Sequence, residues 1–418
     1  MTTRRTFLQR VASAAAMLGV APAELVAASE PSAATPVDYY AKLGVPTIIN
    51  AAGTYTYLTA SLMPPEVQAA VSLAAKHSVR LRDLQIAAGA YIARRLRCEA
   101  ALVSSGAASA LSLGTAGCMT LGRADGASDI PARAGTFRNE VLIQRAHRFS
   151  HDHALEMCGA KLVEVETIAD YEAAFTPRTA MAFYFNAAEG GRIDHADWLR
   201  VAHARGVPCF VDAAADVPPI AYLWNYTAMG YDLVAFSGGK GIRGPQNAGL
   251  LLGRADLVAA AAANNNPNDR SVGRGMKVAK EQIVGMVAAL DWLLARTDEQ
   301  IATEAHQRAD RIASHLRRLP SLTTEIIVPA VANHVPHLMI RYDQRRIGIT
   351  PADVAAALRA GKPSIELNPA TGHASGAAGL HSDENTIVVG PWMMSPGEDV
   401  IVGQRLHAVL LGALRTDG

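Results

Sequence analysis

The sequence predicts an α/β protein with a seven-stranded, mostly parallel sheet and a smaller α+β lobe toward the carboxyl terminus. Two observations support this class. Short apolar runs alternate with helical segments between roughly residues 80 and 260, and a polar, asparagine-rich stretch at 264–270 then interrupts the pattern. Such alternation is typical of parallel strands joined by crossover helices. With 418 residues, half of them hydrophobic, the chain is long enough to bury a substantial core.

The expected strands of the main sheet are short apolar runs bounded by turn-forming or polar residues. They are Ala100–Val103, Glu140–Gln144, Lys161–Val165, Thr179–Phe185, Pro208–Asp212, Leu233–Ser237 and Ala248–Leu252. Expected helices include Glu66–Lys76, Leu84–Arg97 and Trp198–Arg205. In the smaller lobe we expect a helix from Lys277 to about Arg296, a second helix, strands near Ile326 and at His337–Ile340, and a closing helix after Glu398.

One lysine, Lys240, stands among glycines shortly after the strand-like run that ends at Phe236. A lysine amine forms a Schiff base with an aldehyde cofactor, and neighbouring glycines let the backbone approach a flat ring and its phosphate. The segment therefore predicts a pyridoxal 5'-phosphate lysine. Such a cofactor also needs an acid at its pyridine nitrogen, and Asp212 follows a buried-type strand where an open parallel sheet delivers catalytic groups. Ala214 is small enough to lie under the ring.

A phosphate site is expected where the strand ending at Val103 runs through a Ser/Gly turn into a helix. Free N–H groups and the positive end of the helix dipole suit an anion there, and the candidates are Ser105, Gly106, Ala107 and Ala108, with Ser237 adding a hydroxyl. By itself such a turn can simply cap a helix, and an aspartate at a strand end can form a turn. The order of turn, aspartate and lysine along one domain-sized stretch favours the cofactor site.

The segment between residues 147 and 153 holds aromatic side chains that could stack on the other face of the ring. An imidazole also moves protons near neutral pH, so His147 and His151 are the candidates for both tasks, with Phe149 as an alternative stacking residue. The same segment could equally be the polar start of a helix, in which the negative charge of Asp152 interacts favourably with the helix dipole. These two interpretations stay open.

The amino terminus predicts export. Arg4 and Arg5, the following Phe-Leu, an alanine-rich apolar stretch and small residues near Ala28 are typical of a twin-arginine signal, after which a periplasmic location is expected. The net charge of +1 gives no electrostatic reason to expect nucleic acid or, after signal removal, membrane as a partner. Four widely spaced cysteines form no zinc pattern, and no metal is expected.

Several motifs together resemble the selenocysteine-synthase-like group of fold-type-I pyridoxal-phosphate enzymes, which includes L-seryl-tRNA selenium transferase and D-glucosaminate-6-phosphate ammonia-lyase. The motifs are Ile49–Thr54, Asp83–Gln85, Ser104–Ala108, Val211–Ala215, Phe236–Lys240 with Gly244–Gln246, and Gly273–Glu281. The resemblance implies an aspartate-aminotransferase-like fold and a homodimer or higher homo-oligomer. The expected division is a signal at 1–33, an arm of the small lobe at 34–79, a large cofactor-binding domain at 80–275, and a linking helix with the carboxyl-terminal lobe at 276–418.

The resemblance also implies a reaction on a small amino acid or amino sugar acid. An export signal in place of a tRNA-binding extension, and the Gly-Gly-Lys240-Gly-Ile-Arg spelling, favour the ammonia-lyase branch and α,β-elimination. Arg243 and Arg274 are expected to bind a substrate carboxylate or phosphate, with Asn50 as a further substrate contact. An aminotransferase or a racemase shares the first step through Lys240 and stays open, as does an exported amine-binding protein that has kept the fold.

Overall fold

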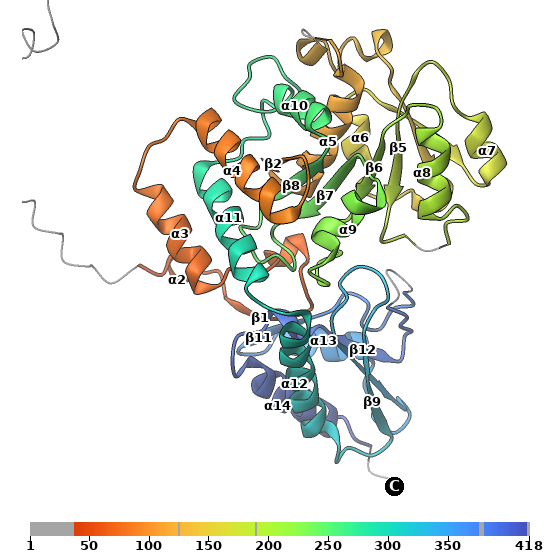
Figure 1. The fold of residues 1–418 in the computed structure, drawn as a ribbon. Coiled ribbons are helices and arrows are strands. Elements are labelled where there is room, and N and C mark those ends of the chain that lie inside the picture. Colours follow the sequence, from red (N-terminus) through yellow and green to blue (C-terminus); the bar gives the residue numbers. More distant parts are fainter. Residues whose placement is uncertain (1–36, 124–125, 189, 376–379, 416–418) are drawn as a thin grey trace, which may run out of the picture. The chain divides into compact units, whose positions relative to one another are not determined.

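The computed structural model describes residues 37–123, 126–188, 190–375 and 380–415 (Figure 1). The chain up to Thr47 is a unit by itself, whose described part contains the short helix α2 (Tyr39–Leu43). Residues from Ile48 onward form the second unit, which holds the three sheets. The predicted twin-arginine signal lies outside the described residues.

The main sheet has seven strands in the order β2-β8-β7-β6-β5-β3-β4. All neighbouring pairs are parallel except those of β8, which runs antiparallel to both β2 and β7. The strands are β2 (Ala100–Ser104), β3 (Glu140–Gln144), β4 (Lys161–Val165), β5 (Thr179–Phe185), β6 (Cys209–Asp212), β7 (Leu233–Ser237) and β8 (Gly249–Gly253). Each lies within one residue of the expected bounds, so the predicted mostly parallel sheet is confirmed.

Helices cover both faces of this sheet, and each face has its own apolar core. Successive strand residues alternate between the two cores, as Leu102 and Val103 do, so the strands read as continuous apolar runs. Helix α8 begins three residues before the expected start because Asp194 caps it, accepting a hydrogen bond from the Asp197 N–H. The helices are α3 (Pro65–Ala75), α4 (Leu81–Leu96), α5 (Gly106–Thr120), α6 (His153–Glu156), α7 (Ile168–Ala173), α8 (His195–His203), α9 (Tyr222–Met229), α10 (Ala255–Ala263) and α11 (Lys280–Leu294).

The smaller lobe is built on two further sheets. β1 (Ile48–Ala51) pairs in parallel with β11 (Ser364–Leu367), while β9 (Leu322–Ile327), β10 (His337–Tyr342) and β12 (Thr386–Val389) form an antiparallel sheet. Its helices are α12 (Asp298–Leu316), α13 (Pro351–Arg359) and α14 (Glu398–Gly412). A capping box between Thr297 and Gln300 fixes the start of α12. Among the described residues, no helix has the length and apolar character needed to span a membrane.

Candidate active site

A cavity of about 700 Å³ opens at the carboxyl ends of β6 and β7, beside the first turn of α5. In open parallel sheets this edge is where ligands bind. The structure brings most of the predicted cofactor residues together here. The predicted residues that line the cavity are Gly106, Ala107, Ala108, His151, Asp212, Ala214, Ser237 and Lys240.

Lys240 is held by a tight loop that follows β7. The Gly244 N–H donates to the Gly238 carbonyl (2.7 Å), and the Arg243 N–H donates to the carbonyl of Lys240 itself (2.9 Å). A Cβ at Gly241 would lie 1.9 Å from the Val217 carbonyl oxygen, so only glycine fits beside the lysine. Burial lowers the pKa of the Lys240 ammonium, while the charges of Asp212 and Asp216 act in the opposite direction. The amine is therefore more available in its neutral, nucleophilic form than an exposed lysine.

Asp212 ends β6 and is almost completely buried. Its Oδ1 accepts a hydrogen bond from the Ala214 N–H (2.9 Å). Burial raises the pKa of this carboxyl, and neither that hydrogen bond nor the charge of Lys240 fully offsets the burial. A buried carboxylate in this state is stabilised by a cationic N–H partner, which is what a protonated pyridine nitrogen provides.

The first turn of α5 forms an anion cradle. Gly106 begins the helix with a φ of +81°, and Ser105, which precedes it, makes no side-chain cap, so the first backbone N–H groups keep their capacity to bind an anion. A Cβ at Gly249 would lie 2.3 Å from the Gly106 carbonyl carbon, so β8 approaches the turn as closely as a glycine allows. Ser105 does not line the cavity, whereas Ser237 does. This cradle, Asp212 and Lys240 together fit pyridoxal phosphate.

The two predicted histidines lie in different places. His151 lines the cavity together with Phe149, whose ring stacks on Phe185 at 3.8 Å between centroids. His147 is buried outside the cavity, where its Nδ1 accepts a hydrogen bond from the Phe185 N–H (3.3 Å). Burial lowers the pKa of His147 to about 4, so this imidazole is neutral. Of the two, only His151 is placed to meet a ligand in the cavity.

The predicted substrate residues do not line the cavity. The Arg243 Nε donates to the Leu62 carbonyl (3.0 Å), and Arg274 forms an ion pair with Asp269 (3.2 Å). The Asn50 side chain is bound to the backbone, because its Oδ1 accepts hydrogen bonds from the N–H groups of residues 52 and 53. The expected substrate contacts of these three side chains are therefore not supported by their positions in the structure.

Asp216 is a cavity residue to which the sequence analysis assigned no role. Its Oδ2 accepts hydrogen bonds from Asn186 Nδ2 (2.8 Å) and from the Tyr226 hydroxyl (2.7 Å). Its Oδ1 is buried and has no hydrogen-bond partner among the described residues. Burial raises the pKa of this carboxyl to about 6. The signal that could have found it is a second acid, four residues after Asp212, inside an otherwise uncharged segment.

The wall supplied by the smaller lobe was also missed. It carries Tyr55, Asn333, His337 and Asn368. His337 is buried, and its Nδ1–H donates to the Val335 carbonyl (2.8 Å), which leaves Nε2 as an acceptor. Asn368 is fixed by a hydrogen bond from its Nδ2 to the Ala52 carbonyl (3.0 Å). These residues come from segments far apart in the sequence, so no local motif marks them as one site.

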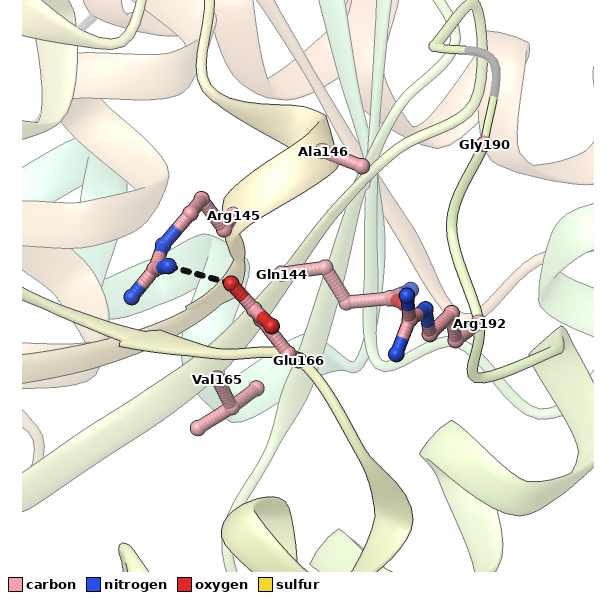
Figure 2. A pocket seen from close by; sticks show the side chains of 7 residues that line it. All are labelled: Gln144, Arg145, Ala146, Val165, Glu166, Gly190 and Arg192. Atoms are coloured by element: carbon pink, nitrogen blue, oxygen red, sulfur yellow. Dashed lines mark hydrogen bonds and ion pairs between the residues drawn. The ribbon is translucent and has the colours of Figure 1, made fainter.

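A smaller hollow of about 290 Å³ lies at the ends of β3 and β4 (Figure 2). Figure 2 shows Arg145 directed toward Glu166, with which it forms an ion pair, and Arg192 on the opposite side. The charge of Arg145 is thus already compensated, and neither Lys240 nor a predicted cofactor residue lines this hollow. The cavity around Lys240 is therefore the candidate active site.

The chain is similar to several known proteins. The family model described as aminotransferase class-V matches residues 153–378. The 5'-C-glycyluridine monooxygenase-decarboxylase of a Streptomyces species is 28% identical over 388 residues, covering 89% of this chain and 92% of that protein. The L-seryl-tRNA(Sec) selenium transferase of Rhizobium meliloti is 31% identical over 203 residues, 43% of this chain and 38% of that protein.

D-glucosaminate-6-phosphate ammonia-lyases are similar to this chain both in sequence and in solved structure. The D-glucosaminate-6-phosphate ammonia lyase of Salmonella typhimurium is 28% identical over 338 residues, covering 78% of this chain and 88% of that protein. A solved D-glucosaminate-6-phosphate ammonia-lyase superposes with a TM-score of 0.76 at 26% identity, over 91% of this chain and all of that one. The predicted relationship to this group of proteins is confirmed.

Proposed function

Since the chain belongs to the aminotransferase class-V family, a pyridoxal-phosphate-dependent family, we propose that it catalyses α,β-elimination on a small amino acid or amino sugar acid. The observation that carries this proposal is the placement of Lys240 and Asp216 on one cavity. A buried amine there can move a Cα proton, and a buried carboxyl can protonate a leaving group.

The predicted fold type I and the cofactor pyridoxal 5'-phosphate are confirmed by the family and by the relationship to the ammonia-lyase. When bound, the cofactor supplies a ring that accepts the electron pair left by a broken Cα–H bond. We assign its phosphate to the N–H groups of Gly106, Ala107 and Ala108, and its pyridine nitrogen to Asp212. His151 is assigned to the exposed face of the ring.

In the proposed reaction the protein's own groups move the protons. The neutral amine of Lys240 removes the proton from Cα of the bound substrate. Asp216, whose Oδ2 is fixed by Asn186 and Tyr226, presents its Oδ1 toward the β-substituent and donates a proton as that group leaves. The raised pKa of about 6 keeps a useful fraction of this carboxyl protonated near neutral pH.

A leaving-group acid distinguishes elimination from the alternative reactions. Racemisation needs a second base at Cα, and amino transfer needs a proton delivered to the cofactor, but neither needs a carboxyl beside the β-carbon. Similarity to an ammonia-lyase over most of the chain supports the same choice. The substrate carboxylate is assigned to the side-chain amides of Asn333 and Asn368, because Arg243 and Arg274 lie outside the cavity.

The test is a substrate panel of β-hydroxy amino acids and amino sugar acids incubated with the holoenzyme. We expect release of ammonia and a 2-oxo acid, with Lys240→Ala as the inactive control. Inverted configuration without ammonia, or amino transfer to an added 2-oxo acid, would contradict elimination. Oxygen-dependent release of carbon dioxide would instead align the chain with the Streptomyces relative. No product and no Cα deuterium exchange from any substrate would favour amine binding alone.

We propose in addition that the enzyme acts as a homodimer or a larger homo-oligomer. Large apolar side chains are exposed between residues 57 and 86, namely Tyr57, Leu62, Leu73, Val79 and Ile86. Monomeric proteins rarely leave such surfaces uncovered, and this segment directly follows Tyr55 and Thr56 of the cavity wall. The molar mass of the holoenzyme, measured by light scattering after size-exclusion chromatography, tests the proposal. The mass of a monomer at micromolar concentration would contradict it.

A further inference from the structure

A third, much smaller cavity lies beside the Lys240 loop. It has an interior of about 30 Å³, enough for one or two particles of the size of water. Gly241 and Arg243 of the lysine loop belong to its lining, as do Glu304 and Arg308 of α12. Trp292 of α11 and Arg296, which follows that helix, complete the part of the lining that carries charge or an aromatic ring. The cavity thus joins the two lobes beside the loop of the catalytic lysine.

The charges around this cavity do not balance. Three guanidinium groups, those of Arg243, Arg296 and Arg308, face one carboxylate, that of Glu304. Glu304 pairs with Arg296, and no ion pair joins Arg243 or Arg308 to an acid among the described residues. The Arg296 Nε is buried, and it has no hydrogen-bond partner among the residues that the structure describes. Arginine does not lose its charge in proteins, so two positive charges stay uncompensated.

The geometry holds the arginines together in spite of their repulsion. Arg243 and Arg296 both lie against the Trp292 ring, with guanidinium carbons 5.5 and 4.9 Å from its centroid. Arg243 has a φ of +60°, which is unusual for a residue with a side chain. Burial lowers the pKa of Arg243 first, and the charge of Arg308 lowers it further. The three arginine side chains are half-buried, and like charges held this close together repel one another unless an anion lies between them.

We propose that this cavity binds a small monovalent inorganic anion of chloride size between Arg243 and Arg308. The anion joins α12 to the turn in which the Arg243 N–H is bonded to the Lys240 carbonyl. It thereby ties the position of the smaller lobe to the loop of the catalytic lysine. The small interior excludes organic acids and sugar phosphates, so this site is separate from the substrate cavity.

The test measures the thermal midpoint of the holoenzyme at constant ionic strength while chloride replaces gluconate, an anion too large for the cavity. We expect the midpoint to rise with chloride, by about 2–4 °C at saturation. Arg308→Gln removes one of the repelling charges and should abolish the chloride dependence. Arg318→Gln, an exposed arginine just beyond α12, is the matched control and should respond like the wild type.

A second measurement covers the case in which Arg308→Gln does not fold. Crystals of the wild-type holoenzyme soaked in bromide should show an anomalous peak between the guanidinium groups of Arg243 and Arg308. Equal chloride responses in the wild type and in Arg308→Gln would overturn the proposal. Bromide bound only elsewhere on the molecule would do the same. Neither measurement depends on the reaction that the enzyme catalyses.

Discussion

Replacing Asp216 with asparagine should remove the proton donor for the leaving group and leave the other functions of the site intact. The amide has the size of the carboxyl, and its oxygen can still accept the hydrogen bonds of Asn186 and Tyr226. The NH₂ group then takes the place of the unpartnered Oδ1. Asp216→Asn should therefore fold, bind the cofactor and exchange the Cα proton through Lys240, but it cannot donate a proton to a departing hydroxyl.

The size of the effects follows from the buried carboxyl. Loss of a positioned general acid lowers turnover by about 10²–10⁴-fold. The rise of the Asp216 pKa from its usual 3.8 to about 6 corresponds to about 3 kcal/mol. Because the folded state binds this proton more tightly than the unfolded state, wild-type stability decreases as pH rises from about 4 to 6. Asp216→Asn lacks this loss and should be at least as stable as the wild type at pH 8.

The assay compares a β-hydroxy substrate with its β-chloro analogue, since chloride leaves without a proton. Asp216→Asn should lower kcat for the hydroxy substrate by at least 100-fold and for the chloro analogue by less than tenfold. Wild-type turnover of the hydroxy substrate should fall above pH of about 6, as Asp216 ionises. Tyr226→Phe removes a hydrogen bond that favours the ionised carboxyl of Asp216. The pH above which turnover falls should therefore be about 1 pH unit higher in this variant. Equal losses for both substrates would refute the leaving-group role.

Three further predictions concern the cofactor and the amino terminus. Lys240→Ala should lose the borohydride-sensitive yellow band of the wild type, and an equally yellow variant would contradict its role. Gly249→Ala should weaken cofactor binding at least tenfold in a titration, because its Cβ would lie 2.3 Å from the phosphate turn, whereas Gly135→Ala has open space and should bind normally. A reporter carrying residues 1–40 should be exported, and replacing Arg4 and Arg5 with lysine should block export; unchanged export would refute the twin-arginine signal.

The large sheet could be predicted from the sequence because all its strands except the edge strand β4 are largely buried on both faces and therefore appear as short, mainly apolar runs. The order of cofactor residues could be predicted for a related reason. Gly106 begins a helix, Asp212 ends a strand and Lys240 follows one closely, and backbone geometry decides where such positions point. The position of the lysine, the acid and the turn is thus a property of local sequence.

The substrate side could not be predicted in the same way. Side chains such as Arg243 and Arg274 can point to either side of a tight loop, and long-range packing decides the direction. His337 and Asn368 reach the cavity only because the smaller lobe places them there, and the turn residues that follow Asn368 do not by themselves mark a ligand. Lobe boundaries and the export signal stay predictions.

The reversed strand β8 also governs when the site can form during folding. Gly249, its first residue, is paired with Ser104 at the end of β2 and with Ser237 at the end of β7. Residues 104 and 237 are distant in sequence, and strand pairs of this separation form slowly because a long loop must close first. A nascent chain that has not yet placed Gly249 between them has no complete cofactor pocket. Cofactor uptake therefore reports the late closure of this sheet, and a ribosome-bound fragment that ends before residue 249 should stay colourless.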